Sequence, residues 1–336
     1  MTDQHKLYIN GEWIETNASV TNVSPSDTSD VIGHYAQAST EQVEAAITSA
    51  NAAVIEWGQS ALETRYAALM EIGNELIARS GELGELLARE EGKTRAEGVG
   101  EVYRSGQFFH YFAGEVHRQI DDRAESVRPG IEIDTRREPV GVVAIISPWN
   151  FPMATAVWKI APALAFGNAV IFKPANLVPA SAWALTEIIS RQGALPAGTF
   201  NLIMGSGGAA GDAIINNPNI HAVSFTGSLP VGREAAQATA ANLVKCQIEM
   251  GSKNALIVAA DADLDVAVNA AFVGAYSGTG QKCTASSRLI VDASVHDEFV
   301  AKLIAKLETT TVGHALGEGV DLGPVASEHQ LSENLP

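Results

Sequence analysis

Three side chains, far apart in the 336-residue sequence, have the types needed for covalent chemistry on a carbonyl compound. Cys283 follows a run of small residues that would let a substrate approach, and the neighbouring Lys282 would favour its nucleophilic thiolate. Glu249 ends a predicted strand, where apolar neighbours would raise its pKa and suit it to act as a general base. The amide of Asn150, in a turn between two prolines, could donate hydrogen bonds to an oxyanion.

Each of these residues also has an ordinary structural interpretation. A single cysteine is most often a small buried core residue, which fits Cys246 in the segment 244–248, where apolar residues alternate with polar ones, and stays open for Cys283. Glu249 could be a solvent-facing loop residue, and Asn150 an ordinary turn residue. The eight histidines have no metal-ligand spacing, so the sequence predicts no metal site.

Glycine-rich turns after predicted strands could bind a phosphate. The segment 224–232 ends a strand and opens a helix, whose free N–H groups and dipole attract an anion. The turn 205–208 follows another strand in the same way. Lys173 lies at the carboxyl end of a strand, where ligands gather in parallel sheets. Neither turn has the spacing GxGxxG, so purely conformational glycines and a solvated Lys173 stay as alternatives.

These residues lie in a pattern of alternating strands and helices. Apolar runs predict strands at 140–146, 169–172, 200–204, 222–225, 255–258 and 289–291. Helical spacing predicts helices at 155–166, 180–191, 209–216, 231–241 and 264–276. Near-continuous apolar strands alternating with helices are typical of a parallel sheet covered on both faces. We therefore predict an α/β fold.

The first 140 residues follow another pattern. A turn-rich opening with one short strand at 6–10 extends to about residue 38. Ser39 and Gln42 then have the spacing of a capping box, and apolar periodicity predicts helices at 43–54, 66–77 and 102–116. Alternating charged residues at 121–137 predict a hairpin that leaves the main body.

Composition limits the class of protein. A length of 336 residues and 46% hydrophobic content predict a globular chain of two domains, and a net charge of −17 argues against nucleic-acid binding. The longest apolar runs are too short to span a membrane. Two cysteines and an opening segment without an apolar leader predict a cytoplasmic protein.

Taken in order, five segments resemble motifs of the aldehyde dehydrogenase superfamily. They are Pro148-Trp149-Asn150-Phe151-Pro152, Lys173-Pro174-Ala175, Phe225-Thr226-Gly227-Ser228, Glu249-Met250-Gly251-Ser252-Lys253-Asn254 and Gly280-Gln281-Lys282-Cys283. The resemblance extends from about Leu7 to the end of the sequence. It implies a Rossmann-type parallel sheet with helices on both faces and a second α/β catalytic domain. The implied limits are 1–120 and 139–249 for the dinucleotide-binding domain, 121–138 for an oligomerisation hairpin and 250–336 for part of the catalytic domain.

The resemblance also implies a reaction, the oxidation of an aldehyde to a carboxylate. Cys283 would attack the carbonyl and form a thiohemiacetal, whose oxyanion the Asn150 amide and the Cys283 backbone N–H would hold. A nicotinamide coenzyme, NAD or NADP, would take up the hydride and leave a thioester. Glu249 would then activate the water that hydrolyses the thioester.

By the same matching, the coenzyme would lie along the ends of several predicted strands. The implied coenzyme-binding residues are Ile146, Ser147, Pro148, Trp149, Lys173, Ala175, Asn176, Gly207, Phe225, Thr226, Gly227, Ser228, Val231 and Gly232. Many NAD-preferring relatives carry a glutamate at the position of Asn176. Without that carboxylate, the 2′-phosphate of NADP would meet no repulsion, so we expect NADP to be accepted alongside NAD.

The motifs around Cys283 and Lys173 look most like those of 2-oxoglutarate semialdehyde (2,5-dioxopentanoate) dehydrogenases. Succinate-semialdehyde dehydrogenases are the nearest alternative, and these often have an arginine at the position of Trp158. Arg104 falls where the family's substrate tunnel is lined and could bind the far carboxylate of a semialdehyde. A solvated helix charge is the alternative for Arg104.

Members of the superfamily continue well beyond a position equivalent to Pro336 and usually form homo-oligomers. We therefore expect the sequence to hold only part of the catalytic domain. Two further interpretations stay open: a catalytically incomplete cofactor-binding fragment, and an α/β enzyme that uses Cys283 for acyl transfer without redox chemistry.

Overall fold

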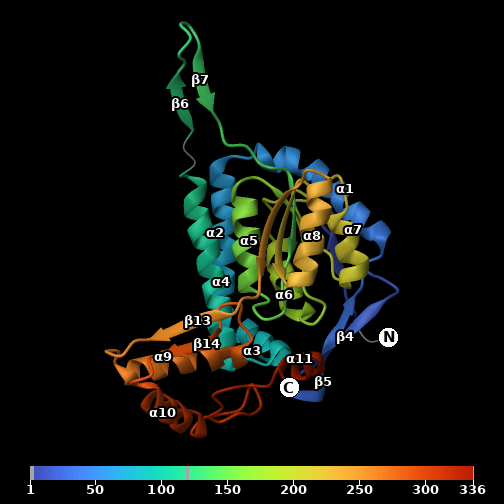
Figure 1. Ribbon diagram of the computed structural model, residues 1–336. Coiled ribbons are helices and arrows are strands. Elements are labelled where there is room, and N and C mark those ends of the chain that lie inside the picture. Colours follow the sequence, from blue (N-terminus) through green and yellow to red (C-terminus); the bar gives the residue numbers. More distant parts are fainter. Residues whose placement is uncertain (1–3, 119–120, 336) are drawn as a thin grey trace.

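The computed structural model describes residues 4–118 and 121–335, so the predicted domain limits at residues 1, 120 and 336 lie outside it. Figure 1 shows a large α/β unit, a hairpin that projects from its top and a smaller α/β unit below it. The predicted α/β fold class is confirmed.

A seven-stranded sheet, in the order β12-β11-β8-β9-β10-β2-β3, forms the centre of the large unit. Its strands are β2 (Leu7–Ile9), β3 (Glu12–Ile14), β8 (Val142–Ile146), β9 (Ala169–Lys173), β10 (Phe200–Leu202), β11 (Ala222–Gly227) and β12 (Lys245–Met250). Strands β8 to β12 run parallel to one another, and β2 and β3 form an antiparallel edge. The chain builds β9 and β10 on one side of β8 and β11 and β12 on the other. This reversal creates a switch point between β8 and β11, where ligands of such sheets bind.

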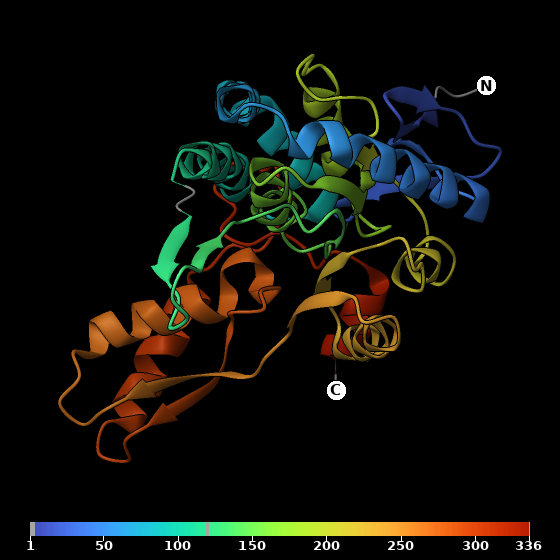
Figure 2. The same ribbon diagram turned by 90° about the horizontal axis from the view of Figure 1, so that it is seen from above.

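Helices cover both faces of this sheet, as predicted. They are α1 (Thr40–Gly58), α2 (Leu62–Ala78), α3 (Ser80–Glu91), α4 (Arg95–Val116), α5 (Ala154–Ala165), α6 (Pro179–Ser190), α7 (Asp212–Ile215), which the π-helical turn η1 (Gly207–Gly211) precedes, and α8 (Leu229–Ala241). Helices α5 and α6, with α2 to α4 packed against them, lie on one face, and α1, α7 and α8 lie on the other (Figure 2). The predicted capping box of α1 is present, because Ser39 and Gln42 each bond the other's backbone N–H.

The sequence did not predict α3, whose two glycines lower its helix propensity. The structure gives Gly84 of α3 a packing role, together with Gly98 of the neighbouring helix α4. A Cβ atom at Gly84 would lie 2.4 Å from Cα of Val99, and one at Gly98 would lie 2.3 Å from the carbonyl oxygen of Gly84. Glycine at both positions therefore lets α3 and α4 approach each other closely.

The strand predicted at 6–10 is confirmed by β2, but the turn-rich remainder predicted up to residue 38 is wrong. Strands β1 (Gln4–His5), β4 (Ser19–Ser24) and β5 (Asp27–Ala36) form a second sheet there, in the order β1-β5-β4. Many residues of β4 and β5 are polar and exposed, so no apolar alternation marks these strands in the sequence.

The smaller unit contains β13 (Asn254–Val258), α9 (Leu264–Tyr276), the 3₁₀ turn η2 (Ser277–Gly280), β14 (Ser286–Val291), α10 (His296–Glu308) and α11 (Glu328–Asn334). Strands β13 and β14 pair in parallel. Five of its buried apolar residues form a cluster separate from the main core: Val258, Val268, Ala271, Phe299 and Leu303. The separation agrees with two folding units, although the domain limits themselves stay a prediction.

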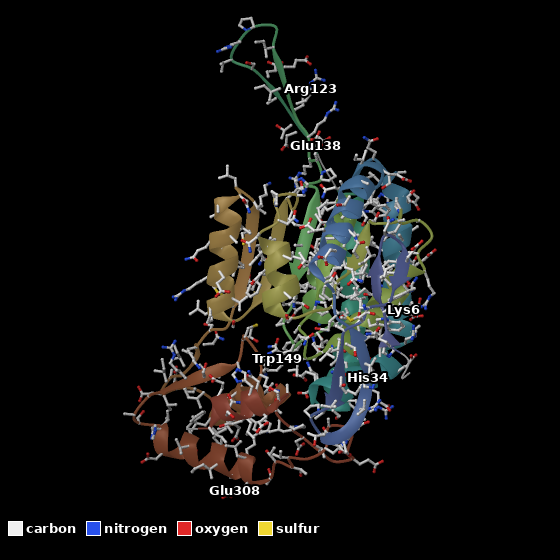
Figure 3. The ribbon with its side chains drawn as sticks, turned by 90° about the vertical axis from the view of Figure 1, so that its right-hand side faces the viewer. Lys6, His34, Arg123, Glu138, Trp149 and Glu308 are labelled. Carbon is white, nitrogen blue, oxygen red and sulfur yellow. The ribbon has the colours of Figure 1, made fainter. Side chains whose placement is uncertain are left out.

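Strands β6 (Asp122–Glu125) and β7 (Glu132–Thr135) form the hairpin, and every residue in them is exposed. Figure 3 shows the hairpin, marked by Arg123 and Glu138, at the end of the molecule opposite Glu308 of α10. Among the helices of residues 4–118 and 121–335, none has the length and apolar content needed to cross a membrane.

Candidate active site

Most of the predicted site residues lie at the carboxyl ends of the parallel strands. Ile146, the last residue of β8, is paired in register with Phe225 on one side and with Lys173 on the other. Thr226 is paired with Glu249 on the edge strand. The segment after β8 carries Trp149 into the region between the two α/β units (Figure 3). The sheet thus brings together residues that the sequence separates by about one hundred positions.

Two buried hydroxyls at the switch point have no protein partner. Ser147 and Thr226 follow directly after the paired residues of β8 and β11, and they are 3% and 8% exposed. Among the described residues, neither Ser147 Oγ nor Thr226 Oγ1 has a hydrogen-bond partner. A buried hydroxyl without a partner is costly, so both fit a site that a polar ligand completes. These residues suit a dinucleotide at the switch point.

Helix α8 begins directly after this site. Its N-cap residue Ser228 makes no side-chain capping bond, so the N–H groups of Leu229 and of the exposed Val231 are open to an anion, while Pro230 between them has no N–H. Gly232 is different: it is buried, and a Cβ atom there would lie 2.6 Å from Sδ of Met250. Gly232 therefore has a packing role between α8 and β12 whether or not it approaches a phosphate.

Lys173 is a buried cation at the end of β9. Its side chain is 5% exposed and its Nζ donates to the carbonyl oxygen of Pro174 at 3.1 Å. Burial lowers the pKa of Lys173 to about 8. Its aliphatic part lies beneath Gly211, in the turn that begins at Gly207, and the exposed Asn176 follows three residues later. Ala175, next to Asn176, is half-buried.

Cys283 lies in the exposed loop between η2 and β14. Asn254, at the start of β13, holds this loop, since its Nδ2 donates to the carbonyl oxygen of Cys283 at 2.8 Å. Lys282, which was expected to favour the thiolate of Cys283, has other partners. Its ammonium donates to the carbonyl oxygen of Val273 and to Oγ of Ser277 at the end of α9, at 2.9 and 2.7 Å. Lys282 therefore caps a helix.

Asn150 contacts the cysteine loop directly. Its Nδ2 donates to the carbonyl oxygen of Gln281, two residues before Cys283, at 2.7 Å. A side-chain amide has two N–H donors, so this bond orients the group and leaves one donor for an oxyanion. The structure thus ties the predicted oxyanion donor to the loop that carries the predicted nucleophile, although 131 residues separate Asn150 from Gln281.

Glu249 lies on the edge strand β12, and its side chain is exposed. Of the two interpretations left open for Glu249, the structure shows the solvent-facing one and not the apolar surroundings, since β12 has a neighbouring strand on one side only. Gln247 Nε2 donates to Glu249 Oε1 at 3.1 Å. The exposed carboxylate has ready access to water, which a general base for hydrolysis requires.

The sequence analysis missed Lys159 of α5. This lysine is 7% exposed, and its Nζ donates to Oγ of Ser224 at 2.8 Å and to Oε1 of Gln247 at 3.1 Å. Burial lowers the pKa of Lys159 to about 8, and the charge of Glu249 partly opposes that shift. A lysine within the otherwise apolar, buried face of α5 was the available signal.

The two predicted substrate residues lie on neighbouring helices. Arg104 of α4 and Trp158 of α5 are both exposed, and Trp158 is 43% exposed despite its size. The ring of Trp158 meets that of Phe108 edge to face, with centroids 6.1 Å apart. Phe108 follows Arg104 by one helical turn, so Arg104 and Phe108 lie on the same face of α4.

Sequence comparison identifies the family. A profile of the aldehyde dehydrogenase family matches residues 13–335. The chain belongs to the aldehyde dehydrogenase family. The predicted family is therefore confirmed, and the aldehyde dehydrogenase fold with it.

Three similar proteins illustrate the range of this family. The alpha-ketoglutaric semialdehyde dehydrogenase of Bacillus subtilis (strain 168) is 39% identical over 330 residues, which are 98% of this chain and 67% of the relative. The succinate-semialdehyde dehydrogenase GabD of Escherichia coli (strain K12), named for NADP(+), is 36% identical, with 98% and 68% covered. A crystal structure of betaine aldehyde dehydrogenase from Staphylococcus aureus in complex with NAD+ has a TM-score of 0.95 and 33% identity, with 98% and 66% covered.

The aldehyde dehydrogenase chain described here spans about two thirds of the length of these proteins. The family uses NAD or NADP, as the names of these relatives illustrate, so the coenzymes predicted from the sequence are confirmed for the family.

Proposed function

We propose that this chain oxidises a semialdehyde to the carboxylate with NAD or NADP, through a thioester on Cys283. The observation that carries the proposal is the bond from the Asn150 amide to Gln281, which ties the proposed oxyanion donor to the loop that carries Cys283. The orphaned hydroxyls of Ser147 and Thr226 support a dinucleotide at the switch point.

The reaction follows from these residues. The Cys283 thiolate adds to the aldehyde carbon, and the free N–H of the Asn150 amide, with the Cys283 backbone N–H, stabilises the oxyanion that forms. When bound, the nicotinamide coenzyme supplies the oxidant. Glu249 then removes a proton from a water molecule that attacks the thioester, which releases the carboxylate and frees the thiol.

The substrate we propose is 2-oxoglutarate semialdehyde, because the B. subtilis relative is named for the same aldehyde. Succinate semialdehyde is the second candidate, since the E. coli relative acts on it by name. The test is the absorbance of reduced nucleotide formed by the purified chain with each semialdehyde and each coenzyme. Reduced nucleotide formed with either semialdehyde supports the proposal. Nucleotide binding without turnover would contradict it and favour the cofactor-binding fragment, and thiol-dependent ester hydrolysis indifferent to nucleotide would favour acyl transfer.

Arg104 provides a test of the substrate class. We expect Arg104→Leu to raise KM for a semialdehyde about 10- to 100-fold, because the far carboxylate loses a charged hydrogen-bond partner. A neutral aldehyde should be nearly unaffected. Arg95→Leu is the matched control, since Arg95 begins the same helix and pairs with Glu85 at the surface. Equal effects of Arg104→Leu on both aldehydes would remove Arg104 from the site.

Lys173 predicts how coenzyme preference changes with pH. Burial lowers its pKa to about 8, so the unliganded protein loses this positive charge above that pH. By the family resemblance, Lys173 would bind the adenosine ribose, where NADP carries its 2′-phosphate. That phosphate binds the protonated lysine more tightly, so NADP binding takes up a proton and weakens up to about tenfold per pH unit above pH 8. NAD has a hydroxyl at that position, and its affinity should change little. Titration calorimetry across this pH range checks the difference, which Lys173→Met should remove.

We further propose that the chain is cytoplasmic and that the β6–β7 hairpin mediates homo-oligomerisation. Every residue of both hairpin strands is exposed, and Ile131 and Ile133 are 48% and 47% exposed, which leaves apolar surface for a second copy to cover.

A further inference from the structure

A buried lysine lies behind the loop that carries Asn150. Lys93 is 3% exposed, and its Nζ donates to Oε2 of Glu101 and to the carbonyl oxygen of Asn150, each at 2.8 Å. The same ammonium lies 4.0 Å from the centre of the Phe151 ring. The segment 90–93 that carries this lysine has no part in the chemistry proposed above.

Glu101 connects this lysine to the start of α5. Its second oxygen, Oε1, accepts hydrogen bonds from the backbone N–H groups of Met153 and Ala154, both at 3.0 Å. The carboxylate is buried and accepts at both oxygens, so it caps α5 while it pairs with Lys93. Lys93 and Glu101 therefore hold the loop between β8 and α5 at both ends of its residues 150–154.

Glu97 lies one turn before Glu101 on α4 and reaches the other loop. Its Oε1 accepts the backbone N–H of Gly278 at 2.7 Å, and its Oε2 completes the capping box of α4 with Thr94. Gly278 is in η2, five residues before Cys283, and has a φ of +60°, a conformation that glycine adopts without strain. Helix α4 thus contacts both loops through carboxylates four residues apart.

We propose that Lys93, Glu101 and Glu97 are positioning residues that hold two loops in fixed relative positions. One is the loop between β8 and α5, which carries Asn150, and the other is the segment from η2 to β14, which carries Cys283. This inference rests on the proposed function, because the relative position of the loops matters for catalysis only if the Asn150 amide stabilises the oxyanion that forms at Cys283. The bond from Asn150 to Gln281 then joins two loops that α4 already fixes from behind.

A charged cluster suits this task better than an apolar one. Lys93 and Glu101 are both about as buried as core residues, and burial of such charges costs free energy unless each finds its partners. The Lys93 ammonium and the Glu101 carboxylate reach those partners only when the backbone atoms of Asn150, Met153 and Ala154 are in place. Apolar contacts would tolerate small shifts of the loop, whereas these directional bonds do not.

The first test measures loop protection without any turnover. We expect Lys93→Met to speed amide hydrogen exchange about tenfold or more in the segments 150–154 and 277–283, with α8 and β12 unchanged. Lys6→Met is the control, since Lys6 pairs with Glu15 at the surface, beside the N-terminal strands and far in sequence from both loops. Unchanged exchange in both loops, or faster exchange throughout the chain, would overturn the proposal.

The second test measures function by a double-mutant cycle. We expect Lys93→Met to lower kcat about 10- to 100-fold and to change KM and nucleotide affinity less than about threefold. In an Asn150→Ala background the same substitution should cost less than about threefold, because its effect acts through Asn150. Equal losses in the two backgrounds would contradict a positioning role through Asn150.

If Lys93→Met does not fold, Glu97→Ala provides the test. Glu97 is only half-buried, so its replacement should destabilise the fold less. We expect faster exchange in the segment 277–283 alone, and Glu97→Gln, which keeps an acceptor for Gly278, should restore protection. Unchanged exchange in Glu97→Ala would overturn the proposal. If the unmodified chain shows no turnover, the proposed function fails, while the exchange results still decide whether the cluster positions the loops.

Discussion

Cys283→Ala is expected to abolish aldehyde oxidation, with kcat lowered on the order of 10³-fold or more. The reason is that without a thiol no thiohemiacetal or thioester can form, and no other side chain in the proposed reaction adds to the carbonyl carbon. Nucleotide binding should be retained, because Cys283 lies in a loop of the smaller unit and the proposed coenzyme residues lie on the strands, turns and helix α8 of the large unit. Steady-state turnover and nucleotide titration together check this result.

Cys246→Ala is the matched control, since both cysteines are free and exposed. Cys246 lies on the edge strand β12, paired in register with Val223, and we expect its replacement to leave turnover within about twofold. A thiol reagent should inactivate the unmodified protein and the Cys246→Ala variant equally. Loss of turnover in Cys246→Ala together with full activity in Cys283→Ala would reverse the assignment of the nucleophile.

The second large effect is expected for Asn150→Ala, which should lower kcat about 10²- to 10³-fold with little change in KM. One N–H of the Asn150 amide does not bond Gln281, and it can donate to the oxyanion only as the thiol adds to the carbonyl. Its removal therefore raises the free energy of the transition state more than that of the bound aldehyde. Pre-steady-state measurement of nucleotide reduction with saturating aldehyde checks this expectation, because it isolates the steps before thioester hydrolysis.

Asn51→Ala is the control for removal of an amide. Asn51 of α1 donates to the carbonyl oxygens of Ile47 and Asn219, on the helical layer away from the cysteine loop. We expect this variant to lose some stability and to keep kcat within about twofold. A rise in KM alone for Asn150→Ala would mean that the amide binds the aldehyde without stabilising the oxyanion.

Glu249 shows what local sequence reasoning leaves open in the site itself. The residues beside it in sequence are apolar, yet they allowed either an apolar environment or a solvent-facing carboxylate. Side chains alternate across a strand, and β12 is at the edge of the sheet, so the carboxylate faces solvent. Sequence neighbours on a strand therefore do not describe a side chain's surroundings.

The sequence by itself determined the family, the α/β class and most strands and helices from residue 140 to residue 276. These features depend on short stretches of sequence: apolar runs, helical periodicity and short motifs. Such patterns can be interpreted without knowing which distant residues pack against them. The capping box at Ser39 and Gln42 was predictable for the same reason.

Only the tertiary structure decided which groups serve the site. Lys93 bonds a carbonyl 57 residues away, and Glu97 bonds an N–H 181 residues away. Lys282, next to the cysteine in sequence, caps a helix. Hydrogen bonds depend on distances of about 3 Å between particular atoms, and packing across the whole chain sets those distances. No pattern along the sequence records them.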